Sequence, residues 1–181
     1  MSAADELAAL MDDRGRLNYG ENVTTAEHSL LTAAAAEQQG HHDTLVAACL
    51  MHDVGHWLDE PDDGYGIHDH GDLGGDWVAA RFDAAVSEPV RLHVDAKRFL
   101  CAREPDYHDR LSPASQHTLT KQGGPMTADE ATAFEARPHA TDAVLLRRLE
   151  DDHGKRTGVE VLPLSHFRPL LDRLEAGGPQ A

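Results

Sequence analysis

The sequence predicts a single all-α domain. Alanine is abundant and runs of β-branched residues are short, which favours helices over a sheet. Apolar residues recur three and four positions apart in several segments, the spacing of an amphipathic helix. At 181 residues the chain is long enough to bury one sizeable core and short for two. We therefore expect residues 1–181 to form one helical bundle, with its core between about residues 17 and 175.

Two helices are expected in the N-terminal part of the chain. The first is a short amphipathic helix within residues 1–17. A polar loop follows, and Thr24 with Glu27 has the pattern of a capping box that opens the second helix. His28 shares a face of that helix with Leu31, so its imidazole is expected to point toward the core.

The third helix ends in a histidine followed by an aspartate. Its apolar face is formed by residues spaced i, i+3, i+4 and i+7, namely Leu45, Ala48, Cys49 and His52. Asp53 is expected to continue the same helix, about 100° further round. Burying its carboxylate is costly without a partner. Either the histidine and the aspartate satisfy each other, or a cation lies beside them.

Two more helices are expected after a loop rich in Gly and Asp. The first, from Asp72 to Ala85, is preceded by His70 at its entrance. The second is expected to be capped by Ser87. It places His93 and Lys97 one turn apart on one face, a possible metal ligand beside a positive charge, although a solvated lysine is the ordinary alternative.

Short helices are expected in the C-terminal half. Ser115 and Thr118 share a face of one of them, so their hydroxyls either bind an anion or face solvent. A helix over residues 141–150 is expected to end at Asp151. Its buried residues are expected to be Val144, Leu145 and Leu149. An amphipathic helix over residues 165–175 precedes an unstructured tail.

Charge and composition exclude several classes of partner. The net charge is −16, from 16 basic and 32 acidic residues, which argues against a nucleic acid or an anionic membrane as partner. The N-terminus lacks the pattern of a signal peptide, and no apolar run has the length of a membrane span. Cys49 and Cys101 have no zinc-binding spacing and are expected to be reduced thiols. A cytoplasmic location is expected.

The order of the candidate ligands is typical of one superfamily. His28, the pair His52-Asp53 and the distant Asp151 follow one another as in HD-domain proteins, which are all-helical and bind metal inside the bundle. This resemblance implies that the four side chains are metal ligands.

Two further imidazoles extend the set. With His70 and His93 it contains four histidines and two aspartates, more than one ion needs. Such a set suits two metals bridged by the carboxylate of Asp53. Nitrogen and oxygen donors fit iron, manganese or zinc, and the residue types do not choose among them.

Longer motifs surround the candidate ligands. In chain order they are Glu27-His28-Ser29, His52-Asp53-Val54-Gly55-His56, Gly64-Tyr65-Gly66 with His70, His93-Val94-Asp95-Ala96-Lys97-Arg98-Phe99, Gln122-Gly123-Gly124-Pro125-Met126, and Asp151 with Gly154-Lys155. Together they resemble the HD-domain mixed-valent di-iron oxygenases of organophosphonate catabolism, relatives of the myo-inositol oxygenases. The resemblance implies an Fe(II)/Fe(III) pair that uses O2 to split the C–P bond of a 1-hydroxyphosphonate into phosphate and a carboxylic acid. It also implies a separate upstream oxygenase that hydroxylates C1.

The resemblance assigns roles to individual residues. The implied iron ligands are His28, His52, Asp53, His70, His93 and Asp151, with Asp53 as the bridge. The implied phosphonate-binding residues are His56, Lys97, Ser115, Thr118 and Arg148, and Asp53, His56 and Lys97 are the implied catalytic residues. A positive charge confined to the pocket explains how so acidic a chain holds a dianion, because distant surface acids are screened within about 8–10 Å.

The remaining pocket residues bear on the substrate. Tyr19 and Glu21 are expected at the cationic nitrogen, which an aromatic ring and a carboxylate suit. Family members that act on 2-amino-1-hydroxyethylphosphonate have two residues between this Tyr and Glu, whereas only Gly20 separates them here. We therefore expect (R)-1-hydroxy-2-(trimethylammonio)ethylphosphonate as substrate, giving glycine betaine and phosphate. The alternative is the free amine, giving glycine and phosphate.

Two other functions fit the HD pattern. Most HD proteins are phosphohydrolases that act through a metal-bound hydroxide on a phosphate ester. A metal-binding sensor domain without turnover is the other alternative. The six candidate ligands and Lys97 favour the oxygenase over both.

Overall fold

The structure, a computed structural model, describes residues 1–178 and confirms the all-α fold, since all regular structure in that range is helical. The elements are α1 (Ala3–Arg14), α2 (Thr25–Gln38), α3 (Asp43–Met51), the 3-10 helix η1 (Val54–Trp57), α4 (His70–Ala79), α5 (Ala84–Arg103), α6 (Tyr107–Arg110), α7 (Pro113–Lys121), α8 (Ala128–Glu135), α9 (Ala140–His153) and α10 (Leu164–Gly177). The last residues of the predicted unstructured tail, 179–181, lie outside the described range.

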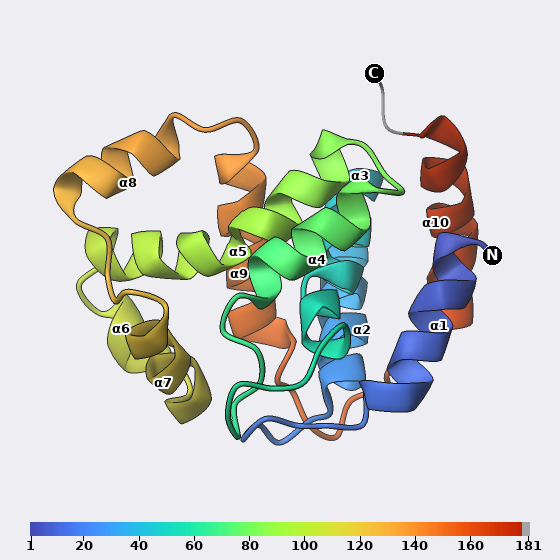
Figure 1. The fold of residues 1–181 in the computed structure, drawn as a ribbon, viewed down its shortest axis with the longest axis horizontal. Helices are drawn as coiled ribbons and strands as arrows, with labels where there is room; N and C mark the ends of the chain where they lie inside the picture. The colour runs from blue at the N-terminus through green and yellow to red at the C-terminus, as the bar shows by residue number, and fades with distance from the viewer. Residues whose placement is uncertain (179–181) are drawn as a thin grey trace.

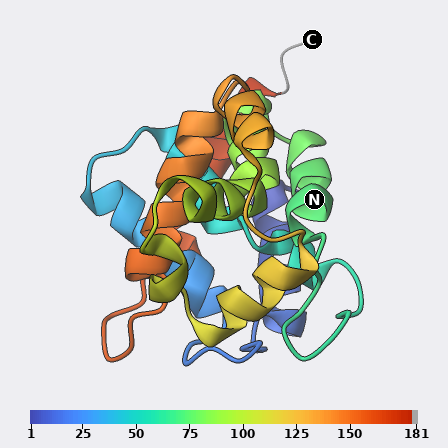
Figure 2. The ribbon, with the colours of Figure 1, turned by 90° about the vertical axis from the view of Figure 1, so that its left-hand side faces the viewer.

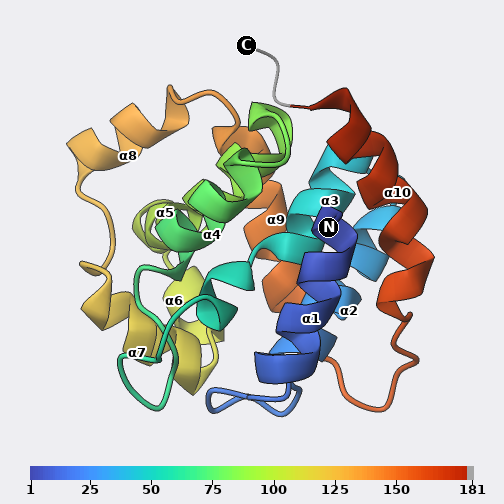
Figure 3. The ribbon, with the colours of Figure 1, turned by 45° about the vertical axis from the view of Figure 1, so that its right-hand side comes forward.

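The bundle is organised around α5, the longest helix. It packs against α3, α4 and α9, and α2 packs against α3 and α9 (Figure 1). Helices α1 and α10 pair at one end of the molecule (Figure 3), while α6, α7 and α8 lie at the other. The loops before α2, before α4 and after α9 gather along one edge of the bundle (Figure 2).

The main core lies where α2, α3 and α9 meet. Helix α3 is buried on all sides from Leu45 to Met51, as its uniformly apolar sequence requires. The run Ala33–Ala36 of α2 is buried too, and these small side chains let neighbouring helices approach closely. Within residues 1–178 no helix combines the length and apolarity that crossing a bilayer requires.

Local signals locate some helix ends and miss others. The capping box that starts α2 is confirmed: the Thr24 hydroxyl accepts from the Glu27 N–H at 3.2 Å, and the Glu27 carboxylate accepts from the Thr24 N–H at 2.8 Å. Ser87 does not cap α5, which already begins at Ala84 because the Asp83 side chain accepts from the Ala85 N–H. Helix α4 ends at Ala79 rather than at residue 85.

The central histidine and aspartate lie at the end of α3 and not within a continuous helix. Helix α3 ends at Met51, and His52 is its C-terminal cap. Asp53 has φ −97° and ψ 6°, outside the helical region, and η1 begins at the next residue. The prediction of one helix through Asp53 is therefore wrong. The turn brings the Asp53 carboxylate into the space between the helices.

The buried face of α9 differs from the predicted one by about one position. Leu149 is buried as predicted, but Val144 and Leu145 are only half-buried, while Leu146, Arg147 and Glu150 are buried. Charged residues thus occupy part of the inward face. Relative to the predicted orientation, α9 is thus rotated about its own axis. This rotation changes which of its side chains reach the centre of the bundle.

Candidate active site

Four imidazoles converge on the carboxylate of Asp53. They come from four segments of the chain: His28 from α2, His52 from the end of α3, His70 from the start of α4 and His93 from α5. The Nε2 atoms of His28 and His52 lie 3.6 and 3.4 Å from Asp53 Oδ2. Those of His70 and His93 lie 3.6 and 3.7 Å from Oδ1. One oxygen therefore faces each pair of histidines, the arrangement that a carboxylate bridging two metals needs.

The tautomer of each of these histidines is set by a backbone carbonyl. The Nδ1 atoms lie 2.9 Å from the Gly154 oxygen for His28, 2.8 Å from that of Cys49 for His52, 2.7 Å from that of Ile67 for His70 and 2.6 Å from that of Val90 for His93. In the neutral ring Nδ1 is then the donor and Nε2 carries the lone pair. This is the orientation in which second partners hold metal-bound histidines.

The lone pairs face one another within each pair of histidines. The Nε2 atoms are 3.1 Å apart in the pair His28 and His52, and 3.0 Å apart in the pair His70 and His93. Two lone pairs at this distance repel each other unless a proton or a metal cation lies between them. The residues therefore fit two metal ions.

A carboxylate of α9 completes one half of this centre, and it belongs to Glu150. Its two oxygens each lie 3.8 Å from an Nε2 atom, one from His28 and the other from His52. Glu150 Oε2 is buried and has no hydrogen-bond partner among the described residues. An unpaired buried carboxylate oxygen beside two imidazoles fits a metal ligand.

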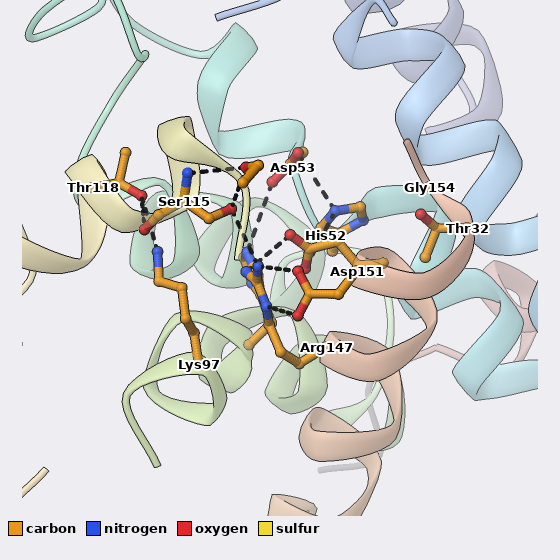
Figure 4. Close-up of polar contacts among 12 residues, drawn as sticks. Thr32, His52, Asp53, Lys97, Ser115, Thr118, Arg147, Asp151 and Gly154 are labelled. Carbon is orange, nitrogen blue, oxygen red and sulfur yellow. Dashed lines mark hydrogen bonds and ion pairs between the residues drawn. The ribbon is translucent and has the colours of Figure 1, made fainter. Parts of the chain in front are cut away.

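Asp151, the ligand predicted from the sequence, is placed elsewhere. Its carboxylate lies 2.5 Å from Nη2 and 3.0 Å from Nε of Arg147 (Figure 4). It also accepts a hydrogen bond from the Tyr107 hydroxyl. No ion pair joins it to His28 or His52 in the described chain. The structure therefore places Glu150, and not the predicted Asp151, against His28 and His52, because the orientation of α9 turns Glu150 inward.

Electrostatics keep the centre in a state that binds cations. Burial raises the pKa of Asp53, but His52, His56 and His28 outweigh burial and hold the pKa well below its ordinary value. Burial lowers the pKa of His70 to about 3, with a contribution from His56, so this imidazole stays neutral. Burial also lowers the pKa of His52, yet the Asp53 carboxylate outweighs it and the pKa rises to about 9. A metal ion would replace the proton of His52.

His56 differs from the four convergent histidines in its tautomer. Its Nδ1 accepts a hydrogen bond from the Ile67 N–H at 3.0 Å, so its Nε2 carries the proton. Burial lowers the pKa of His56 to about 4, and its ring stacks on His70 with centroids 3.9 Å apart. Gly66 permits this packing, because a Cβ there would lie 2.5 Å from His56 Nδ1. His56 is thus a neutral hydrogen-bond donor beside the centre.

A pocket opens next to the metal-binding residues. Among the residues assigned to substrate binding or catalysis from the sequence, the following line it: Tyr19, Glu21, Asp53, His56, Lys97, Ser115 and Thr118. Of the predicted ligands, His28 and His70 also line it, whereas His52 and His93 lie behind the lining. Residues assigned from distant motifs are therefore brought together on one cavity.

Lys97 is the cation of the pocket that has no carboxylate partner. It is 2% exposed, and its Nζ donates to the Thr118 hydroxyl at 3.0 Å (Figure 4). No carboxylate lies within ion-pair distance of it in residues 1–178. Burial, with the neighbouring Arg147, lowers the pKa of Lys97 to about 7.

The arginine that reaches the pocket is Arg147. Its guanidinium is 3% exposed and lies 2.9 Å from Glu150 and 2.5 Å from Asp151. Arg148, predicted to bind the phosphonate, points away, with 41% of its side chain exposed and an ion pair to Glu104. Arg147, and not the predicted Arg148, therefore lines the pocket. In both cases the residue of α9 that faces the site lies one position before the predicted one: Glu150 before Asp151, and Arg147 before Arg148.

Lys155 is a pocket residue to which the sequence analysis gave no role. Its Nζ donates to the hydroxyls of Ser112 and Ser115, each at 3.0 Å, and lies 3.1 Å from a Glu21 oxygen. Its place in the Gly154-Lys155 motif was the signal that could have identified it. The contact also means that Glu21 already has a cationic partner.

Two characterised relatives decide the family. A [1-hydroxy-2-(trimethylamino)ethyl]phosphonate dioxygenase (glycine-betaine-forming) of Leisingera caerulea is 38% identical over 177 residues, which cover 93% of this chain and 88% of that protein. A hydroxymethylphosphonate dioxygenase of Gimesia maris is 41% identical over 171 residues, covering 92% and 85%. The chain belongs to the phosphonate dioxygenases.

A viral relative and a scan of protein families are the two other comparisons. An uncharacterized protein of Acanthamoeba polyphaga mimivirus is 32% identical to this phosphonate dioxygenase over 169 residues, which cover 90% of the chain and 77% of the viral protein. No protein-family model matches the chain.

The charges that line the pocket of this phosphonate dioxygenase cancel. Three bases, Lys97, Arg147 and Lys155, stand against three acids, Glu21, Asp53 and Glu150. A dianionic ligand would leave this lining with a net negative charge unless cations were added. Metal ions at the convergent histidines supply that charge next to the ligand.

Proposed function

We propose that the protein uses O2 to split the C–P bond of a 1-hydroxyphosphonate and releases phosphate and a carboxylic acid. The observation that carries the proposal is the Asp53 carboxylate shared by two pairs of lone-pair-bearing imidazoles, at the wall of a pocket that holds the unpaired Lys97. The identity to two phosphonate dioxygenases supports it.

The metal centre in this proposal is an Fe(II)/Fe(III) pair. One site would be formed by His28, His52, Asp53 and Glu150, and the other by Asp53, His70 and His93. Two irons held there would supply the redox chemistry with O2. The chain contributes the bridge, the imidazole donors and a cavity beside them, and nitrogen and oxygen donors without thiolate suit this metal.

The phosphonate in this proposal is held by the cationic side of the pocket. Lys97 and the Thr118 hydroxyl lie 3.0 Å apart and would bind one phosphonate oxygen between them. The Ser115 hydroxyl, already in contact with Lys155 Nζ at 3.0 Å, would bind another. His56 would donate its Nε2 proton to substrate or to a reacting oxygen, since its Nδ1 is occupied by a backbone N–H.

The substrate we propose is (R)-1-hydroxy-2-(trimethylammonio)ethylphosphonate, with glycine betaine as the carboxylic acid product. The activity for which the Leisingera relative is named supports it. The rings of Tyr19 and Tyr65 both line the pocket, and aromatic faces suit a quaternary ammonium. The 1-hydroxyl of such a substrate would come from an upstream hydroxylating oxygenase.

One contact favours a second candidate, hydroxymethylphosphonate, which has no cationic group. The Glu21 carboxylate, expected to face the ammonium, lies 3.1 Å from Lys155 Nζ and is already neutralised. A pocket in which Glu21 is paired has less need of a cationic substrate. The Gimesia relative, named for this activity, also supports it, and the products would be formate and phosphate.

The test is an assay of products on iron-loaded protein. Each candidate phosphonate, including 2-amino-1-hydroxyethylphosphonate, is mixed with protein without O2, and O2 is then added. Phosphate, glycine betaine, glycine, formate and O2 uptake are quantified. For the wild type we expect one phosphate and one carboxylic acid for each O2 consumed. The Lys97→Ala variant should retain iron but lose activity at low substrate concentration.

The product identity then distinguishes the candidates. Glycine betaine supports the trimethylated substrate, and formate supports hydroxymethylphosphonate. A phosphate ester is assayed in parallel without O2. Phosphate released from it would instead establish a phosphohydrolase. No phosphate from any phosphonate refutes the proposal.

A further inference from the structure

Three side chains of metal-ligating types lie together next to Tyr65, a residue of the pocket lining, and apart from the convergent histidines. Asp63 and His68 belong to the loop before α4, and His117 belongs to α7. The loop and α7 lie beside each other in Figures 2 and 3. Asp63 Oδ2 is 3.0 Å from His68 Nε2 and 3.1 Å from His117 Nε2. One donor atom from each of the three residues lies within 4.8 Å of the others.

The separations of these donors match a common metal. Ligands about 2.0–2.2 Å from a tetrahedral zinc ion are about 3.3–3.6 Å apart, so small side-chain movements would admit an ion. Two imidazole nitrogens and one carboxylate oxygen are donors for zinc and similar ions, whereas calcium takes six to eight oxygens. The side chains are 21–36% exposed, so an ion can reach them from solvent.

Each donor is held in place by a partner outside the set. The other ring nitrogen of His68 faces the Asp62 carboxylate at 3.6 Å, and the same carboxylate accepts from the His68 N–H at 2.7 Å. Asp63 Oδ1 accepts from the Tyr65 N–H at 2.8 Å, which leaves Oδ2 for a ligand role. The Tyr65 ring stacks on His117 with centroids 4.3 Å apart. Such second partners orient metal ligands and preserve their geometry.

The charge state of Asp63 is consistent with a ligand. Its hydrogen bonds to His117 and to the Tyr65 backbone lower the pKa of Asp63 to about 2, so the carboxylate is ionised at neutral pH. The ionised carboxylate is the form that binds a cation.

We propose that Asp63, His68 and His117 form a second, separate metal site that takes a divalent transition-metal cation such as Zn²⁺. The ion joins the loop before α4 to α7. Both segments contribute to the pocket lining, Tyr65 from the loop and Ser115 with Thr118 from α7. An ion at this site therefore ties together two segments that line the pocket.

The test measures zinc bound by the iron-loaded protein. Wild type is dialysed against Zn²⁺ buffered over a range of free concentrations, and zinc and iron per chain are measured by mass spectrometry. Asp63→Asn, which keeps the Oδ1 acceptor, and His117→Ala are compared with His166→Ala. His166 is an exposed histidine of α10 paired with Glu37, and it serves as the matched control. Circular dichroism checks that each variant is folded.

We expect one zinc per chain in addition to the iron of the wild type, with iron content unchanged. Asp63→Asn and His117→Ala should each weaken zinc binding at least about tenfold, and His166→Ala should leave it unchanged. Zinc that binds only as iron is lost, or that binds folded His117→Ala and Asp63→Asn as tightly as wild type, overturns the proposal.

Discussion

Replacing Glu150 by Gln, with Asp151→Asn as its matched partner, tests which carboxylate of α9 binds metal. Both changes remove one negative charge and keep the size of the side chain. Glu150 faces His28 and His52, with oxygens 3.8 Å from their Nε2 atoms, whereas Asp151 faces Arg147 at 2.5 Å. Only the first change should therefore affect the metal content.

The distances set the size of the expected effect. Opposite unit charges 3.8 Å apart, the separation of Glu150 from each imidazole, interact by about 4 kcal/mol at an effective dielectric constant of about 20. A metal ion between them lies closer and has more charge, while desolvation of the carboxylate offsets part of the gain. We expect a net loss of about 3 kcal/mol for Glu150→Gln, which is roughly a hundredfold weaker binding of one iron.

The assay is iron per chain after anaerobic dialysis against a competing chelator, with electron paramagnetic resonance on the same samples. Wild type and Asp151→Asn should keep two irons per chain, and Glu150→Gln should keep about one and lose the signal of the coupled pair. Thermal unfolding shows whether each variant is folded. Loss of iron in folded Asp151→Asn, with two irons retained in Glu150→Gln, would refute the assignment of Glu150.

Further changes test the anion pocket and the packing of α9. Lys97 has a pKa of about 7 and must be protonated to hold a dianion, so binding takes up a proton above pH 7 and is independent of this group below it. The dissociation constant of hydroxymethylphosphonate, measured calorimetrically without O2, should rise up to about tenfold per pH unit above 7, and Lys97→Arg should abolish that rise. Arg147→Ala leaves the buried carboxylate of Glu150 and the partly exposed one of Asp151 without their cation and should lower the free energy of unfolding in urea by about 3–5 kcal/mol. Arg148→Ala breaks an exposed pair and should lower it by less than about 1 kcal/mol. Gly154→Ala would place a Cβ 2.6 Å from His28 Nδ1, so iron content should fall even where the protein folds.

Residue spacing was sufficient to predict the helical fold and the inward orientation of several side chains of the candidate site. The capping box at Thr24 places the start of α2, and the 3.6-residue period of that helix then turns His28 inward. In α5 the same period brings His93 and Lys97 to one buried face. These predictions depend only on the period of a helix and on local caps, so they needed no tertiary information.

The orientation of α9 could not be predicted in the same way. Apolar residues such as Val144 and Leu145 ordinarily mark a buried face, but here Arg147 and Glu150 occupy it because they pair with each other and face the pocket. A rule that places charge outside selects the wrong face of a helix that lines a charged cavity. The hydrogen bond from the His28 ring to the oxygen of Gly154, which anchors the end of α9, joins segments far apart in sequence.

The carbonyl groups that orient the four convergent histidines limit how this centre can change. Because the acceptors belong to the backbone of Cys49, Ile67, Val90 and Gly154, no side-chain replacement at those positions deletes them. Mutation can therefore tune the donor strength of the imidazoles only by shifting a whole segment or by exchanging a ligand. The orientation of the four imidazoles therefore depends on the path of the main chain and not on neighbouring side chains.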